Sequence, residues 1–120
     1  MVSTFNANRA DSTDLNEGVG GGIANGWVAG DDGGVAEILL KESSLLDNVA
    51  QEGGGIANVD AAGYPTRTAE VVISQSTLAR NTAAGVGSQR GSGGGLFNSN
   101  GKAIVANSTF SANQAVGDDE

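Results

Sequence analysis

The chain contains no cysteine, no histidine, one proline and few aromatic side chains. The missing cysteine excludes disulfides, thiolate zinc sites and cysteine nucleophiles. The missing histidine removes the commonest metal ligand in proteins and the usual general base near neutral pH. No apolar run approaches the about 20 residues that a membrane-spanning helix needs. Residues 1–13 also lack the basic region and the apolar stretch of a signal peptide. We therefore expect no membrane insertion by this segment.

Basic residues are scarce as well, with 6 lysines and arginines against 14 aspartates and glutamates, which gives a net charge of −8. Nucleic-acid binding needs clustered basic side chains, so this balance argues against a nucleic-acid partner. Only 38% of the residues are hydrophobic, whereas 20 of the 120 are glycine. Residues 1–120 therefore predict one domain with a thin core.

Two short motifs alternate along the chain. One is a glycine string, which reads "GGGIAN" at 20–25, "GGGIAN" at 53–58 and "GGGLFN" at 93–98. The other is a serine motif, which reads "STFNAN" at 3–8, "SSLLDN" at 43–48, "STLARN" at 76–81 and "STFSAN" at 108–113. Constant blocks joined by variable segments indicate a stacked repeat whose loops absorb the differences in length.

A third block precedes three of the serine motifs, at 36–42, 69–75 and 102–107. Within it, apolar residues alternate with polar ones, and many are β-branched, which is typical of strands. The alternation predicts that one set of side chains points into the core. That set comprises Ile38, Leu40, Val71, Ile73, Ala103 and Val105.

Each repeat therefore carries three short strands: one after the glycines, one in the apolar block and one in the serine motif. Without its insertions a repeat has about 22–24 residues, which fits one coil of a three-sided parallel β-solenoid. We expect an all-β fold of about three coils. The repeat units are 3–42, 43–75, 76–107 and a partial unit 108–120.

The alternation of Gly-Gly-x-Ile with Phe-x-x-Asn resembles the repeats of chlamydial-type polymorphic outer-membrane proteins and, more broadly, the right-handed parallel β-helices of bacterial surface proteins. The matching residues are Gly21-Gly22-Ile23, Gly54-Gly55-Ile56, Gly94-Gly95-Leu96, Phe5 with Asn8, Leu45 with Asn48, Leu78 with Asn81, and Phe110 with Asn113. The resemblance implies a right-handed, single-stranded β-helix. It also implies that the parent protein is extracellular or on the cell surface.

Asparagines recur at two fixed positions of the repeat. Stacked asparagine side chains hydrogen-bond amide to amide along such an axis and tolerate sharp turns. We therefore expect two structural ladders, with sugar binding as the alternative role of these residues. One ladder comprises Asn8, Asn48, Asn81 and Asn113, and the other comprises Asn25, Asn58 and Asn98.

No catalytic or cofactor-binding motif stands out. The glycine strings lack a phosphate-binding lysine and a following helix, so they do not predict a nucleotide site. Acidic side chains are the only metal-ligand candidates, and Ca²⁺ is the one cofactor they would suit. The candidates are Asp31, Asp32, Glu37 and Glu70, of which the two aspartates, with Asp60, could alternatively form a glycosidase-type carboxylate pair. Solvated turns and strand faces are the competing interpretation.

One aliphatic row lies between the inward positions, so the alternation places it on the outer face. It consists of Leu39, Val72 and Ile104, and the loop residues Trp27 and Tyr64 could extend it. Such a stripe predicts a contact surface for a glycan or a surface protein. Alternatively, the loops fold over the stripe and cover it.

We expect a non-catalytic segment of a secreted or cell-surface β-helix protein, of adhesion or scaffold type. The alternatives are part of a β-helix polysaccharide-active enzyme, such as a lyase or epimerase, a glycan-binding module, and a short reading frame with no independent role. About three coils without a capping helix is near the minimum for a solenoid. We therefore also expect a fragment of a longer solenoid or a chain that stacks end to end.

Overall fold

A computed structural model of the chain describes residues 2–10, 18–26, 34–60, 67–86 and 90–117. These residues form fourteen short β-strands and no helix. Every pairing between the strands is parallel, and the strands are divided among four sheets. The prediction of an all-β fold with parallel strands at a repeating spacing is confirmed, and the arrangement is consistent with a β-solenoid.

Two of the sheets contain four strands each. The serine motifs supply the first sheet, in the order β1 (Thr4–Asn6), β5 (Ser44–Leu46), β9 (Thr77–Ala79) and β13 (Thr109–Ser111). The residues that follow each motif supply the second, in the order β2 (Arg9–Ala10), β6 (Val49–Ala50), β10 (Thr82–Ala84) and β14 (Gln114–Val116).

The other two sheets contain three strands each. The ends of the glycine strings form the third sheet, in the order β3 (Ile23–Gly26), β7 (Ile56–Val59) and β11 (Leu96–Ser99). The apolar blocks form the fourth, in the order β4 (Gly34–Lys41), β8 (Arg67–Ser74) and β12 (Lys102–Ala106).

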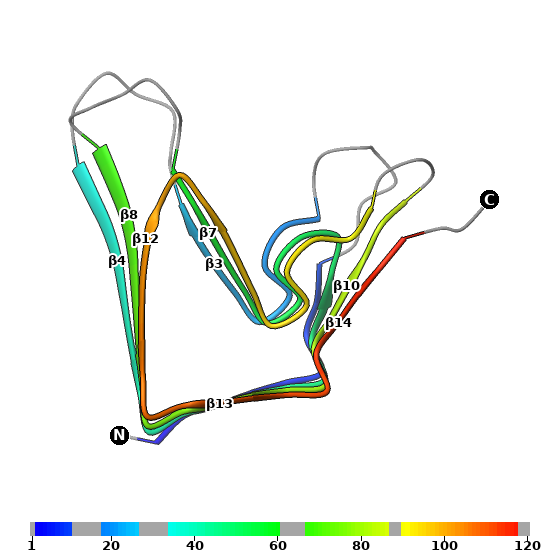
Figure 1. The fold of residues 1–120 in the computed structure, drawn as a ribbon, viewed down its shortest axis with the longest axis horizontal. Helices are drawn as coiled ribbons and strands as arrows, with labels where there is room; N and C mark the ends of the chain where they lie inside the picture. The colour runs from blue at the N-terminus through cyan, green and yellow to red at the C-terminus, as the bar shows by residue number, and fades with distance from the viewer. Residues whose placement is uncertain (1, 11–17, 27–33, 61–66, 87–89, 118–120) are drawn as a thin grey trace.

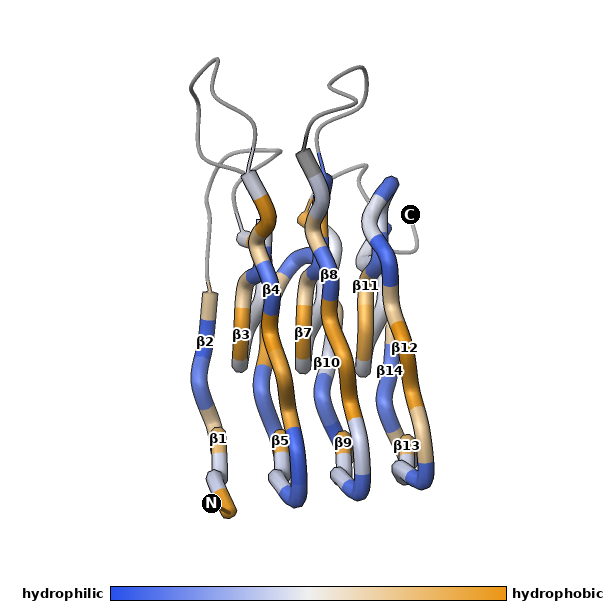
Figure 2. The backbone as a smooth tube through the Cα atoms, turned by 90° about the vertical axis from the view of Figure 1, so that its left-hand side faces the viewer, coloured by the Kyte–Doolittle hydropathy of each residue, from blue (hydrophilic) through white to orange (hydrophobic). Residues whose placement is uncertain are grey.

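The chain visits the four sheets in the same sequence each time, and we call one such pass a circuit. Figure 1 looks along the stack, with the β4–β12 sheet, the β1–β13 sheet and the β3–β11 sheet enclosing a triangle. Figure 2 shows the successive circuits side by side from the N-terminal to the C-terminal end. The prediction of three strands per repeat is wrong, because a fourth strand follows each serine motif. That strand has only two or three residues, too few to show an alternating pattern.

The core lies between the β1–β13, β3–β11 and β4–β12 sheets. Its fully buried side chains come from the middle circuits and include Leu45, Ile56, Val71, Ile73 and Leu78. The equivalent residues of the first and last circuits have a neighbouring circuit on one side only. Phe5 and Ile23, in the first circuit, are therefore only partly buried.

At the C-terminal end the cover is smallest. Val105 pairs with Ile73 and Phe110 pairs with Leu78, yet they are 46% and 41% exposed. The alternation predicts which face these side chains share, but their exposure depends on whether another circuit covers them.

The glycine strings pack directly on the backbone of a neighbouring strand. Gly53 has a φ of +63°, a left-handed conformation that side chains rarely adopt. A Cβ atom on the next residue, Gly54, would lie 2.5 Å from the carbonyl carbon of Thr82 in β10. The glycines therefore allow the β2–β14 sheet to approach the adjoining segment closely, which a larger residue would prevent.

Candidate functional site: polar ladders and an apolar stripe

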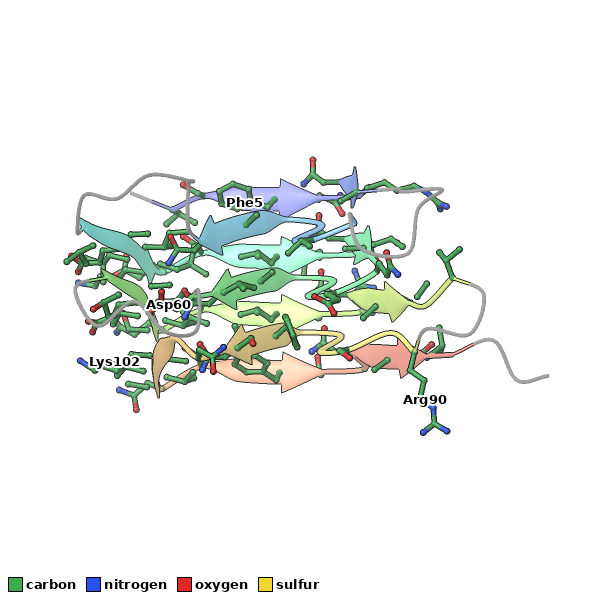
Figure 3. All side chains as sticks on the ribbon, turned by 90° about the horizontal axis from the view of Figure 1, so that it is seen from above. Phe5, Asp60, Arg90 and Lys102 are labelled. Atoms are coloured by element: carbon green, nitrogen blue, oxygen red, sulfur yellow. The ribbon has the colours of Figure 1, made fainter. Side chains whose placement is uncertain are left out.

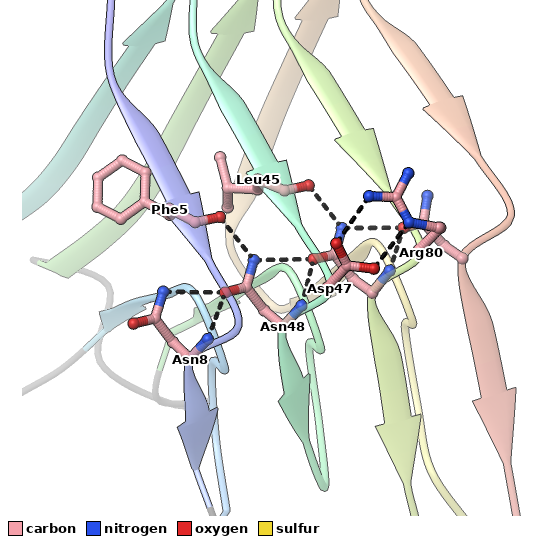
Figure 4. A network of polar contacts seen from close by, with 8 residues as sticks. Phe5, Asn8, Leu45, Asp47, Asn48 and Arg80 are labelled. Atoms are coloured by element: carbon pink, nitrogen blue, oxygen red, sulfur yellow. Dashed lines mark hydrogen bonds and ion pairs between the residues drawn. The ribbon is translucent and has the colours of Figure 1, made fainter.

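The first asparagine row forms a continuous ladder across all four serine motifs (Figure 4). The Nδ2 of each asparagine donates to the Oδ1 of the next, at 2.9 Å in all three steps. The Oδ1 atoms also accept the backbone N–H of the preceding asparagine, at 3.0 to 3.1 Å. The two central members, Asn48 and Asn81, are completely buried.

The remaining amide hydrogen of this row ties the ladder to the strands. Asn48 Nδ2 donates to the carbonyl of Phe5, and Asn81 Nδ2 donates to the carbonyl of Leu45. The left-handed bend lies one residue before each ladder asparagine, as at Asp47 with φ 57°. Each ladder asparagine therefore directly follows a sharp turn, and its side-chain hydrogen bonds stabilise that turn.

The second asparagine row joins the glycine strings to one another. Asn25 Nδ2 donates to Asn58 Oδ1 at 2.7 Å, and Asn58 Nδ2 donates to Asn98 Oδ1 at 2.6 Å. Asn58 Nδ2 also lies 3.2 Å from the carbonyl of Ala69, in the β4–β12 sheet. The side-chain amide nitrogens of the buried members of both rows are engaged in holding the circuits together.

A serine row also bonds the circuits to one another, a role that one copy of the motif alone does not indicate. Ser43 N donates to Ser76 Oγ and Ser76 N donates to Ser108 Oγ, both at 3.1 Å. Each of these hydroxyls donates in turn to the carbonyl two residues earlier, for example Ser76 to Ser74 at 2.7 Å. The recurrence of serine at the start of the motif was the signal that could have revealed it.

Asp47 and Arg80 pair across two circuits on the exposed surface (Figure 4). The guanidinium donates from Nε and NH2 to the two carboxylate oxygens, each at 2.7 Å. These hydrogen bonds lower the pKa of Asp47 and raise the pKa of Arg80. Both side chains are about half exposed, so solvent screens the pair and its contribution to stability is small.

The two candidate metal ligands that the structure describes, Glu37 and Glu70, do not belong to a metal-binding cluster of described residues. Glu37 pairs with Glu70 in the register of β4 and β8, and Glu70 pairs with Lys102 in β12. Lys102 Nζ lies 2.9 Å from Glu70 Oε1, so the lysine engages the carboxylate next to Glu37. The described ranges contain no group of three acidic residues placed to hold a metal ion. Asp31 and Asp32 lie outside the described residues.

The aliphatic row lies on the outer face of the β4–β12 sheet. Leu39 pairs with Val72, and Val72 pairs with Ile104. Leu39 is 67% exposed and Ile104 is 41% exposed, while Val72 is intermediate. We call these three residues the apolar stripe. Trp27 and Tyr64 lie outside the described residues.

Charged side chains are spread over the molecule rather than gathered. In Figure 3 Asp60 and Lys102 lie toward one end of the strands, and Arg90 points outward at the other. A cavity of about 520 Å³ is lined by first-circuit residues and Ser43, mostly apolar ones, including Phe5, Ile23 and Ile38. Among the lining residues that the structure describes, Lys41 is the only charged one. The described residues that line this cavity include no carboxylate beside Lys41.

Within the described parts of the chain, no helix is long and apolar enough to span a membrane. No protein-family model, curated protein or solved structure matches this chain.

Proposed function

We propose that the repeated circuits are the coils of a right-handed, single-stranded parallel β-helix. Parallel strands joined through a crossover in one sheet are right-handed in about 98% of cases, which supports this hand. The resemblance of the glycine and serine motifs to polymorphic outer-membrane repeats supports the same fold. The sense in which the chain winds in an experimental structure tests it, and a left-handed winding would contradict it.

The function that the geometry supports best is a non-catalytic scaffold of adhesion type, within a secreted or cell-surface protein. One observation carries the proposal: the polar side chains that recur along the chain bond from circuit to circuit. Both asparagine rows and the serine row are used in this way, and Asp47 and Glu70 are paired with cations along the stack. Polar groups used for cohesion are not available to activate a substrate.

The apolar stripe is a part of the surface that does not take part in these bonds between circuits. Three aliphatic side chains on an exposed sheet face are able to contact the apolar face of a sugar ring or a protein surface. We assign the stripe as the contact surface of the scaffold, with a glycan or a surface protein as its partner.

Binding of the purified chain to immobilised glycans and to surface proteins of whole cells tests this function. We expect binding by the natural chain and its loss in a variant with Leu39→Ser and Ile104→Ser. A matched control carries Glu42→Ala and Thr68→Ala, two exposed positions outside the stripe. Equal loss in both variants would show that the stripe is not the contact surface.

The non-catalytic part of the proposal has its own test. The chain is incubated with uronate-containing polysaccharides, with and without Ca²⁺, and the unsaturated ends that lyases produce are followed by ultraviolet absorbance. We expect no product. Product formation that is lost in the Glu37→Gln variant would overturn the proposal and favour the polysaccharide-active alternative.

A further inference from the structure

The three polar rows all run in one direction. In both asparagine rows the amide nitrogen donates toward the C-terminal end of the stack. The serine row likewise donates from Ser43 to Ser76 and from Ser76 to Ser108. In the first asparagine row the direction is fixed, since each Oδ1 also accepts a backbone N–H, which an amide nitrogen could not do.

The two ends of the stack are therefore different and complementary. Asn8 uses its backbone N–H and Nδ2 as donors, and among the described residues its Oδ1 has no donor. Asn113 uses one hydrogen of Nδ2 to reach the carbonyl of Leu78 at 2.8 Å. Its other amide hydrogen and its backbone N–H have no acceptor within the described part of the chain. The N-terminal end of the stack thus presents an acceptor, Asn8 Oδ1, and the C-terminal end presents two donors on Asn113.

The backbone and the apolar side chains match in the same register. Gln114 N donates to the carbonyl of Asn81, and Val49 N donates to the carbonyl of Asn8. By the same rule, β2 of a second copy would lie beside β14. Phe110 would then lie against Phe5 of the second copy, as Leu78 lies against Phe110 within one chain.

We propose that this chain associates head to tail with further copies of itself, with β13 pairing with β1 and β14 pairing with β2 of the next copy. The contact repeats the coil-to-coil interface that is already present three times in the β1–β13 sheet. The facing rows of this contact carry no like charges: Thr109 and Ser111 would face Thr4 and Asn6 of the next copy.

The number of strands limits the contact to two of the four sheets. The β1–β13 and β2–β14 sheets have four strands, whereas the β3–β11 and β4–β12 sheets have three. A second copy in register with the first two sheets leaves a gap of one strand, about 4.8 Å of extra separation, in the other two. The association is therefore weak and rests on the edge formed by β13 and β14.

The interface joins two different surfaces, and the symmetry operation that relates one copy to the next does not return to the starting copy. Such an interface generates open chains of molecules rather than a dimer. Sedimentation equilibrium of the natural chain tests this directly. We expect the weight-average mass to rise continuously with protein concentration, without a plateau at twice the monomer mass. Added salt should increase the mass, since it screens the repulsion between chains of net charge −8. A monomer mass at every concentration and ionic strength would overturn the proposal.

Cysteine cross-linking tests the register. The chain contains no natural cysteine, so every disulfide must form between the introduced residues. Thr4→Cys and Thr109→Cys chains are mixed under mild oxidation, and we expect a disulfide between them. A Ser44→Cys, Thr77→Cys double variant is the positive control, because these residues are paired neighbours within one chain. Thr4→Cys mixed with Val116→Cys is the matched negative control, because Val116 lies in a different sheet.

The outcomes separate the modes of contact. Cross-linking of Thr4→Cys to Thr109→Cys in excess over either variant alone supports head-to-tail stacking. A dominant Thr109→Cys homodimer would indicate tail-to-tail contact and overturn the proposal. Equal cross-linking in the Thr4→Cys and Val116→Cys mixture would indicate random collision and overturn it as well. None of these outcomes depends on the partner assigned to the apolar stripe.

Discussion

Replacement of Asn81 by alanine should strongly destabilise the fold. The substitution removes the Oδ1 that accepts both Asn48 N and Asn48 Nδ2, at 3.1 and 2.9 Å. It also removes the Nδ2 that donates to the carbonyl of Leu45 at 3.0 Å and to Asn113 Oδ1 at 2.9 Å. Because Asn48, Leu45 and Asn81 are completely buried, water cannot replace these partners.

The magnitude follows from the groups left unpaired. A buried polar group left without a partner costs about 1–3 kcal/mol, so two such groups cost about 2–6 kcal/mol. Small domains have only about 5–15 kcal/mol of stability in total. The matched variant is Asn8→Ala. Asn8 is exposed and loses a single side-chain bond to Asn48, so its replacement should cost about 1 kcal/mol or less.

Urea unfolding followed by far-ultraviolet circular dichroism measures both variants. The Asn81→Ala midpoint should fall far below that of the natural chain, and the Asn8→Ala midpoint should stay close to it. Equal losses of stability in the two variants would refute the assignment of Asn81 to a buried ladder, because the two asparagines occupy the same position in the serine motif.

Three further perturbations have defined outcomes. Ile73→Asp should unfold the chain, because Ile73 is completely buried in the core; an unchanged circular dichroism spectrum would contradict this. Gly54→Ala should lower the urea midpoint, because its Cβ would meet the Thr82 backbone, whereas Gly34→Ala should not, since nothing lies within 4 Å of that position. Arg80→Gln should raise the pKa of the Asp47 carboxyl, measured by NMR titration. Because Arg80 lowers that pKa, the stability from the pair is present above the unfolded-state pKa of Asp47 and is lost as the pH falls through the folded-state value.

The apolar blocks were the most predictable part of the fold. Alternation identified Leu40, Val71 and Ile73 as core residues, and the structure buries all three. The recurrence of asparagine likewise anticipated bonds between strands. These features follow from local sequence alone, because a strand in a stack contacts the equivalent residues of the strands beside it.

Other features depend on contacts that the sequence does not display. The strand after each serine motif escaped notice because its inward positions are alanines, such as Ala50 and Ala83. Gly54 permits close contact with the backbone of Thr82, which the glycine string by itself does not indicate. The spacing of the motifs places Glu70 beside Lys102, and the structure joins them in an ion pair. The direction of the ladders could not be derived from spacing, since it depends on how the side-chain amides are oriented.

The common direction of the ladders gives the stack an electrical polarity. Side-chain amides aligned donor to acceptor add their dipoles, as peptide groups do along a helix. The C-terminal end therefore carries a partial positive charge and the N-terminal end a partial negative one, independently of the net charge. Exposed Arg9, in the first circuit, stands at the end where such a field favours a cation. Two stacks that met by their like ends would oppose these fields, whereas two stacks that meet head to tail would extend them.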